Sequence, residues 1–160
     1  MTDPVFRLFT PADAAWLTER HGTLYAQSDG FDATFAPLVA GILAAFVADH
    51  DPVREAGWIV EADSQPMGSI FCVRLDDATA KLRLFLLEPA MRGHGLGRRM
   101  LAHCMGFARA AGYARMELWT HESHKAACAL YSAMGWRLAA SKPVHSFGVD
   151  LVEQSWKIDL

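Results

Sequence analysis

Five residues in the middle of the chain, Gly93-His94-Gly95-Leu96-Gly97, have the composition of a phosphate-binding loop. Glycine lets the backbone approach a ligand closely, and a helix that starts at such a loop directs N–H groups and the positive end of its dipole at that ligand. Arg92, Arg98 and Arg99 flank the loop, which suits a ligand with several phosphates. The spacing therefore predicts a polyphosphate site.

The residues around the loop decide between the known kinds of phosphate loop. A nucleoside-triphosphatase P-loop ends in Gly-Lys-Ser/Thr, whereas Gly97 is followed by Arg98. A dinucleotide fold carries GxGxxG after its first strand and an acidic residue at the end of the second. Here the spacing is GxGxG, midway along the chain, and Glu117 lies inside a predicted strand. Both classes are disfavoured, and a tight turn that binds nothing remains as an alternative.

The loop lies between a predicted strand and a predicted helix. Residues 81–87 have the pattern of a strand in which Leu82, Leu84 and Leu86 alternate with Lys81, Arg83 and Phe85. Apolar residues then recur at helical spacing: Met100, Leu101, Cys104, Phe107, Ala108 and Ala111. Residues 116–120 form the next strand. A strand–helix–strand unit of this length predicts a parallel pair with a right-handed crossover.

The rest of the chain supplies the other elements of a sheet with helices on it. Strands are predicted at 6–9, 58–62 and 68–74, and helices at 11–25 and 35–48. Ser123 is expected to cap a helix that stops at Gly135. Two final strands, 137–140 and 154–158, flank a long loop that contains His145. This order predicts an α/β (α+β) fold with mixed pairing, as one domain over residues 1–160.

Composition excludes several classes of protein. The net charge is −3 and no basic stripe is visible, so nucleic acid is not an expected partner. The N-terminus lacks the pattern of a signal peptide, and the apolar run 35–48 is shorter than the roughly 18 residues of a membrane span. That run is predicted to be a buried or interface helix that suits a homodimer. Three separated cysteines without a CxxC pair suggest neither disulfides nor zinc, and the expected location is cytoplasmic.

The loop carries a resemblance to a known family. Residues 92–97 match the R/Q-x-x-G-x-G/A motif of GNAT superfamily acetyltransferases, and Ala127, Leu130-Tyr131 and Gly135-Trp136 resemble that family's A-x-x-L-Y-x-x-x-G-F pattern. The resemblance implies a GNAT fold: a central mixed, largely antiparallel sheet with a V-shaped opening between strands 4 and 5, flanked by the four predicted helices.

Three further segments sharpen this resemblance. KLRLFLLEP, LWTHES and the tail from His145 onward are similar to the acetyltransferase half of bacterial MarR–GNAT fusion proteins. The chain starts where such a half would start, so a DNA-binding half is not expected.

The resemblance implies acetyl-CoA as the cofactor and assigns residues to it. Backbone groups near Leu86 and Leu87 would hold the pantetheine, and N–H groups from Arg92 to Arg98 the pyrophosphate. His124 stands where the family often has an asparagine that contacts the cofactor. Tyr131 matches the tyrosine that faces the CoA sulfur and would protonate the leaving thiolate. Its alternative role is that of a core residue on the same helical face as Ala127.

The implied activity is transfer of an acetyl group to a primary amine, either a small molecule or an amino-acid-like compound, by direct attack in a ternary complex. An ammonium with a pKa near 10 must first lose a proton. Spacing does not select the base among Glu88, Glu117, Glu122, His121 and His145. The alternatives are a non-catalytic acyl-CoA-binding or sensing module and a protein-directed acetyltransferase.

Four residues are candidates for the acceptor pocket, because pocket walls tend to be aromatic with few polar groups: Tyr25, Arg83, Trp119 and His145. Arg83 has solvent as its alternative environment. His121 and His124 do not have H-E-x-x-H spacing and lack an evident third ligand, so no metal site is predicted.

Overall fold

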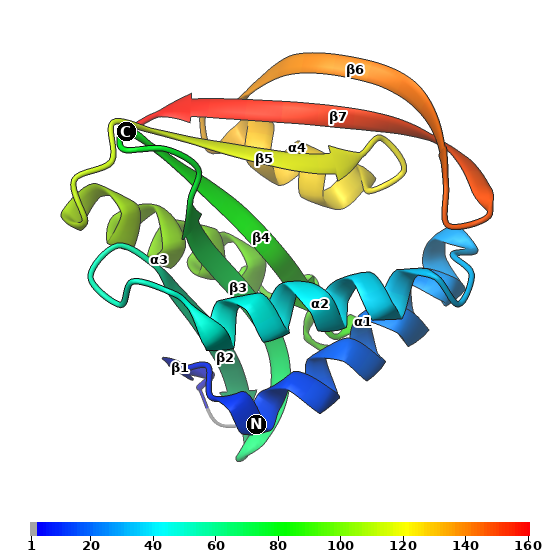
Figure 1. Ribbon diagram of the computed structural model, residues 1–160, viewed down its shortest axis with the longest axis horizontal. Coiled ribbons are helices and arrows are strands. Elements are labelled where there is room, and N and C mark those ends of the chain that lie inside the picture. The colour runs from blue at the N-terminus through cyan, green and yellow to red at the C-terminus, as the bar shows by residue number, and fades with distance from the viewer. Residues whose placement is uncertain (1–2) are drawn as a thin grey trace.

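A single mixed sheet organises the structure, a computed structural model that describes residues 3–160 (Figure 1). Its seven strands have the order β1-β2-β3-β4-β5-β7-β6. The elements are β1 (Val5–Leu8), η1 (Pro11–Asp13), α1 (Ala14–Asp29), α2 (Phe35–Ala48), β2 (Ala56–Ala62), β3 (Gln65–Arg74), β4 (Thr79–Leu87), η2 (Pro89–Met91), α3 (Leu96–Ala110), β5 (Arg115–His121), α4 (Lys125–Ala133), β6 (Arg137–Ser146) and β7 (Val149–Asp159).

The parallel pairing of β4 with β5 is short. The two strands are in register only from Thr79–Lys81 against Arg115–Glu117, whereas both continue well beyond that segment. They then diverge, as Figure 1 shows, and β5 is paired on its other side with β7 along its whole length. The predicted GNAT fold with its V-shaped opening is therefore confirmed, as is the parallel pair connected through α3.

Helices cover both faces of the sheet. The amphipathic α3 packs with α4 over one face, where Met100, Leu101 and Leu118 are almost fully buried. On the opposite face α1 and α2 bury Leu17 and Leu43. The strand β2, which lies between β1 and β3, contributes Trp58 and Val60 to the first cluster and Ile59 to the second. It is covered on both faces and is apolar except at Glu61.

The regular alternation predicted for residues 81–87 is wrong, because β4 contains a bulge. Ser69 pairs with Leu86 and Phe71 with Arg83, so β4 contains one more residue than β3 between these points. Leu84 has a φ of +49°, and the Ser69 hydroxyl donates a hydrogen bond of 2.7 Å to its carbonyl oxygen. The extra residue moves Leu84 and Leu86 to the α1–α2 face, whereas Leu82 stays on the α3 face.

The last two strands also differ from the prediction. β6 and β7 are long and are joined by a two-residue turn, Phe147-Gly148, so the predicted long loop around His145 does not exist. Both turn residues have positive φ, +54° and +77°, as tight hairpin turns require. Most side chains of β6 are exposed to solvent, so its sequence lacks the apolar alternation that marks a half-buried strand. For this reason its full length was not predicted.

The start of α4 is a second correction. The predicted cap, Ser123, makes no capping bond, and His124 is the residue that precedes the helix. The Ser123 hydroxyl donates instead to the Asp29 carboxylate at the end of α1, at 3.2 Å.

Gly148 gives a test of the hairpin turn. We expect Gly148→Ala to lower the free energy of unfolding by about 1–2 kcal/mol, because alanine at positive φ is strained and its Cβ would lie 2.8 Å from the Asp32 carboxylate. Thermal denaturation measures the change. Gly41→Ala is the matched control: a Cβ there meets nothing within 4 Å, and in a helix alanine should stabilise by roughly 0.5–1 kcal/mol. Equal effects of the two substitutions would contradict this description of the turn.

Candidate active site

The glycine loop is preshaped and open. Gly93 and Gly95 have φ values of +82° and +77°, and a Cβ on either would meet no heavy atom within 4 Å. Gly95 immediately precedes α3, whose first N–H groups have no acceptor within the helix. The two glycines therefore permit the positive φ values that the loop requires, and the space beside them is free for a ligand at the positive end of the helix.

The charges around the loop are uncompensated. Arg98 is exposed and Arg99 lies over the Phe6 ring at 5.8 Å. Arg92 donates to the carbonyl oxygen of Leu87 at 3.1 Å, which ties the loop to the end of β4. Within residues 3–160 none of these three arginines forms an ion pair with a carboxylate. The loop thus carries positive charge that is available to an anion.

Tyr131 presents a free hydroxyl from a buried ring. The side chain is 4% exposed and its ring packs near those of Phe85, Trp136 and Trp156. Burial raises the pKa of the phenol well above its ordinary range, so the group is protonated at neutral pH. No hydrogen bond joins the hydroxyl to any described residue, and it is not among the fully buried polar atoms. It is therefore available to a ligand as a proton donor.

The end of α1 brings Tyr25 to the same region. Burial, with a smaller effect of Asp29, raises the pKa of Tyr25 to about 12, and this phenol in turn raises the pKa of Tyr131. The Tyr25 ring stacks on Phe31 and lies 5.1 Å from the His124 ring, centroid to centroid. The structure thus brings Tyr25 of α1 close to His124 and Tyr131, which belong to the start and the body of α4.

The α1–α2 corner is fixed to the β6–β7 turn, and this contact frames the aromatic cluster. The N–H of Asp32 donates to the carbonyl oxygen of Phe147 at 2.9 Å. The Phe147 ring packs against those of Phe31 and Phe35, with centroids 4.8 and 4.9 Å apart. The two segments lie beside each other in Figure 1.

The other predicted acceptor residues are spread along the sheet. Trp119 is 42% exposed, and the Lys81 amine lies over its ring at 3.8 Å. Arg83 is half-buried, burial lowers its pKa, and it lines a groove of about 520 Å³ between α2 and the sheet. His145 lies exposed on β6, 2.8 Å from the Asp150 carboxylate. The structure does not bring these three residues together with Tyr25.

The carboxylates considered as general bases are each occupied by a cation. The Arg20 guanidinium holds Glu88 at 2.6 Å, and the Lys157 amine lies 3.0 Å from Glu117. Glu122 has Lys125 within 3.8 Å and is half exposed. His121 is more enclosed: its Nδ1 is buried without a partner among the described residues, and burial together with His124 lowers its pKa.

One residue of this region escaped sequence analysis. The Asp29 carboxylate is 4% exposed and lies 2.5 Å from Nε2 of His124, which is 95 positions away. No local motif marks such a pair.

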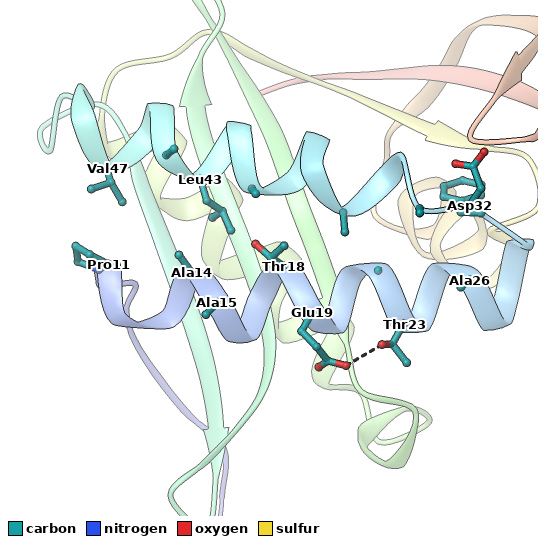
Figure 2. Close-up of a pocket in the computed structure, with 16 residues that line it drawn as sticks. Pro11, Ala14, Ala15, Thr18, Glu19, Thr23, Ala26, Asp32, Leu43 and Val47 are labelled. Atoms are coloured by element: carbon teal, nitrogen blue, oxygen red, sulfur yellow. Dashed lines mark hydrogen bonds between the residues drawn. The ribbon is translucent and has the colours of Figure 1, made fainter.

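A groove between α1 and α2 is a separate feature of about 930 Å³ (Figure 2). Alanine, glycine and threonine make up most of its lining. Glu19 also lines it, and its carboxylate accepts a hydrogen bond from the Thr23 hydroxyl. It contains no basic side chain, so it is unsuited to phosphate. Within residues 3–160 no three or more His, Cys, Asp or Glu side chains form a metal-binding group, and no helix is both long and apolar enough to cross a membrane.

The family model described as the acetyltransferase (GNAT) family matches residues 12–136, more than half of the chain. The chain belongs to this family. It is also 27% identical over 93 residues to N-acetyltransferase 8B from Homo sapiens; the match covers 55% of this chain and 41% of that relative, so the chain spans less than half of the relative's length.

Solved structures of acetyltransferases share the fold over nearly the whole chain. An acetyltransferase from Streptococcus agalactiae has a TM-score of 0.82 at 23% identity, with all of both chains covered. The yncA protein from Salmonella typhimurium, solved with its cofactor acetyl-CoA, has a TM-score of 0.78 at 20% identity and covers 99% of this chain and 95% of its own. A ribosomal-protein-alanine N-acetyltransferase from Brucella melitensis also scores 0.78, at 17% identity, with 98% and 99% covered.

Lys81 gives the site a measurable pH dependence. Burial, with a smaller effect of Arg83, lowers its pKa from 10.5 to about 8. Between these values the unfolded chain binds the proton and the folded chain does not, so this group makes the fold more stable as pH rises from about 8 to 10.5. We expect Lys81→Met to reduce that rise, measured by urea unfolding at pH 7.5 and 10. The exposed Lys125→Met should leave it unchanged. An unaltered rise in Lys81→Met would contradict the lowered pKa.

Proposed function

We propose that this chain is an acetyl-CoA-dependent N-acetyltransferase that moves an acetyl group onto a primary amine within a ternary complex. The observation that carries the proposal is the opening between β4 and β5, with the positively charged glycine loop at one end and the free Tyr131 hydroxyl along its side. A single extended ligand with a polyphosphate head and a reactive thioester tail fits this layout.

The residues present fit the cofactor. Open space beside Gly93 and Gly95, orphan N–H groups at the start of α3 and unpaired arginines suit a pyrophosphate. The loop from Arg92 to Arg98 would hold it, and the backbone of Leu86 and Leu87 would hold the pantetheine at the end of β4. His124, before α4, is the further proposed contact. When bound, acetyl-CoA supplies an activated acetyl thioester.

Tyr131 is the proposed acid of the transfer. As the amine nitrogen bonds to the acetyl carbon, the carbon–sulfur bond breaks and the thiolate must gain a proton. The hydroxyl of Tyr131 is protonated because burial raises its pKa, and it has no competing acceptor. It would donate to the sulfur and recover its proton from water or from the acceptor side.

The acceptor is proposed to be an amino-acid-like amine. Arg83 is a half-buried cation on the α2 side of β4, and no carboxylate of the described residues pairs with it, which supports recognition of an anionic group on the acceptor. Tyr25, Trp119 and His145 do not line one pocket, so each is proposed as a separate acceptor contact, on α1, β5 and β6 respectively. Lys81, which rests on Trp119, is proposed as part of the Trp119 contact.

A protein acceptor is the second candidate. The similarity in fold to the ribosomal-protein-alanine N-acetyltransferase of Brucella melitensis favours it, and the resemblance to MarR–GNAT fusions suggests a separately encoded regulator as target. A 42 Da adduct (one acetyl group) on a peptide but on no small amine would select this candidate. A catalytically silent acyl-CoA sensor would bind acetyl-CoA and acetylate neither.

The apolar α2 supports the proposed homodimer. The helix has no charged residue, and Leu38 and Val47 remain 48% and 42% exposed. Light scattering would measure the mass in solution.

The transfer is tested by thiol release from acetyl-CoA with a panel of amino acids, polyamines and short peptides. We expect Tyr131→Phe to lower kcat by about 100-fold, the lower range for loss of a general acid, while acetyl-CoA still binds.

Tyr113→Phe is the matched control for this test. Tyr113 lies in the segment between α3 and β5 and is as buried as Tyr131. Its hydroxyl, however, donates a hydrogen bond of 2.8 Å to the Arg54 carbonyl oxygen. It should lose about 1 kcal/mol of stability and keep its turnover. Unchanged kcat in Tyr131→Phe would remove the assigned role, and a wild-type protein that releases no thiol with any amine would overturn the proposed function.

A further inference from the structure

A buried carboxylate–imidazole pair joins α1 to the start of α4. Asp29 is the last residue of α1, and its carboxylate lies 2.5 Å from Nε2 of His124, with side chains 4% and 18% exposed. The second carboxylate oxygen accepts from the Ser123 hydroxyl. Among the described residues no lysine or arginine pairs with Asp29, so its one ionic partner is an imidazole.

The pair fixes which nitrogen of His124 carries the hydrogen. A carboxylate only accepts, so Nε2 is the protonated nitrogen and the neutral ring keeps its lone pair on Nδ1. The only protein atom within hydrogen-bond range of Nδ1 in residues 3–160 is the Thr120 hydroxyl, at 3.4 Å, which is the long limit of such a bond. Nδ1 therefore keeps a lone pair whose only protein contact in this range is long.

The ring spans the two faces of the sheet at the opening. Thr120 lies on the same face of β5 as Met116 and Leu118, whose side chains belong to the α3–α4 cluster, whereas Asp29 ends α1 on the other face. The Tyr25 ring lies 5.1 Å from the imidazole, and the Tyr25 phenol raises the pKa of Tyr131.

Among residues 3–160, the groups around the ring include no better-placed base. The titratable groups near it are Asp29 and Tyr25 on α1, His121 on β5, Glu122, Lys125 and Cys128 around the start of α4, and Glu153 on β7. Tyr25 is held neutral by burial. His121 has a buried Nδ1, and Glu122 and Glu153 each have a lysine within 3.8 Å.

We propose that His124 is the general base of the acetyl transfer, with Asp29 as the residue that positions it; this inference rests on the proposed function. Nδ1 takes one proton from the acceptor ammonium, and the neutral amine forms the C–N bond as the C–S bond breaks. The amide nitrogen then loses its second proton, the thiolate gains one through Tyr131, and the imidazolium releases the net proton to water.

The matched variants separate this role from cofactor contact. His124→Asn installs the residue that GNAT proteins often have here, so it should bind acetyl-CoA within about twofold of wild type. It should lose about 100-fold in kcat and lose the acid limb of the kcat/KM–pH profile that a histidine base produces. Asp29→Asn should lower kcat by about tenfold and shift the acid limb of the kcat/KM–pH profile. His103→Gln, on α3 in contact with Trp58 of β2, is the control and should match wild type.

A second measurement keeps the inference testable if a variant does not fold. Nitrogen-15 NMR of the histidine rings in the wild-type protein should show His124 protonated on Nε2 when neutral. Protonation on Nδ1 would overturn the inference, as would kcat within twofold of wild type in His124→Asn. A loss confined to acetyl-CoA affinity would assign His124 to the cofactor instead. Failure of the wild type to acetylate any amine removes the proposed function itself, whatever the ring tautomer.

Discussion

The hydrogen bonding between β4 and β5 ends after Lys81 and Glu117, and the rest of the site follows from that early end. Backbone groups that leave a sheet need other partners, since buried unpaired N–H and C=O groups are costly. The bulge at Leu84 turns one carbonyl back to Ser69, and the Arg92 side chain takes the carbonyl of Leu87. Beyond that segment the two strands diverge, and a ligand between them could supply polar groups of its own.

The opening has different chemistry on its two sides. The α3–α4 side carries the glycine loop and Tyr131, with positive charge at the mouth and a protonated phenol inside. The α1–α2 side is aromatic and is held to the β6–β7 turn through Phe147. The pair of Asp29 and His124 joins the end of α1 to the residue that precedes α4. The layout separates a group that would give a proton from one that would take it, which an acyl transfer to an ammonium requires.

Local patterns predicted the glycine loop and the elements around it, and they missed the contact between α1 and the start of α4. The glycine spacing, the stripe of α3 and the Leu130-Tyr131…Gly135-Trp136 run are short-range signals, and they located the loop, the crossover and α4. The pair of Asp29 and His124 spans 95 positions, so no window of sequence contains it. The bulge at Leu84 depends on pairing with β3, and the Phe147-Gly148 turn lacks the usual asparagine or aspartate. Such features arise only when the strands are assembled.

A thermal-shift titration with acetyl-CoA, with NAD and ATP as controls, tests the central claim most directly: that the glycine loop and the β4–β5 opening form one site for an acyl-CoA. At one hundred times its dissociation constant, a ligand that binds only the folded state adds roughly 2.7 kcal/mol of stability. We expect acetyl-CoA to raise the melting temperature in a saturable manner and neither control to do so. No shift with acetyl-CoA, or a larger shift with NAD, would contradict the account.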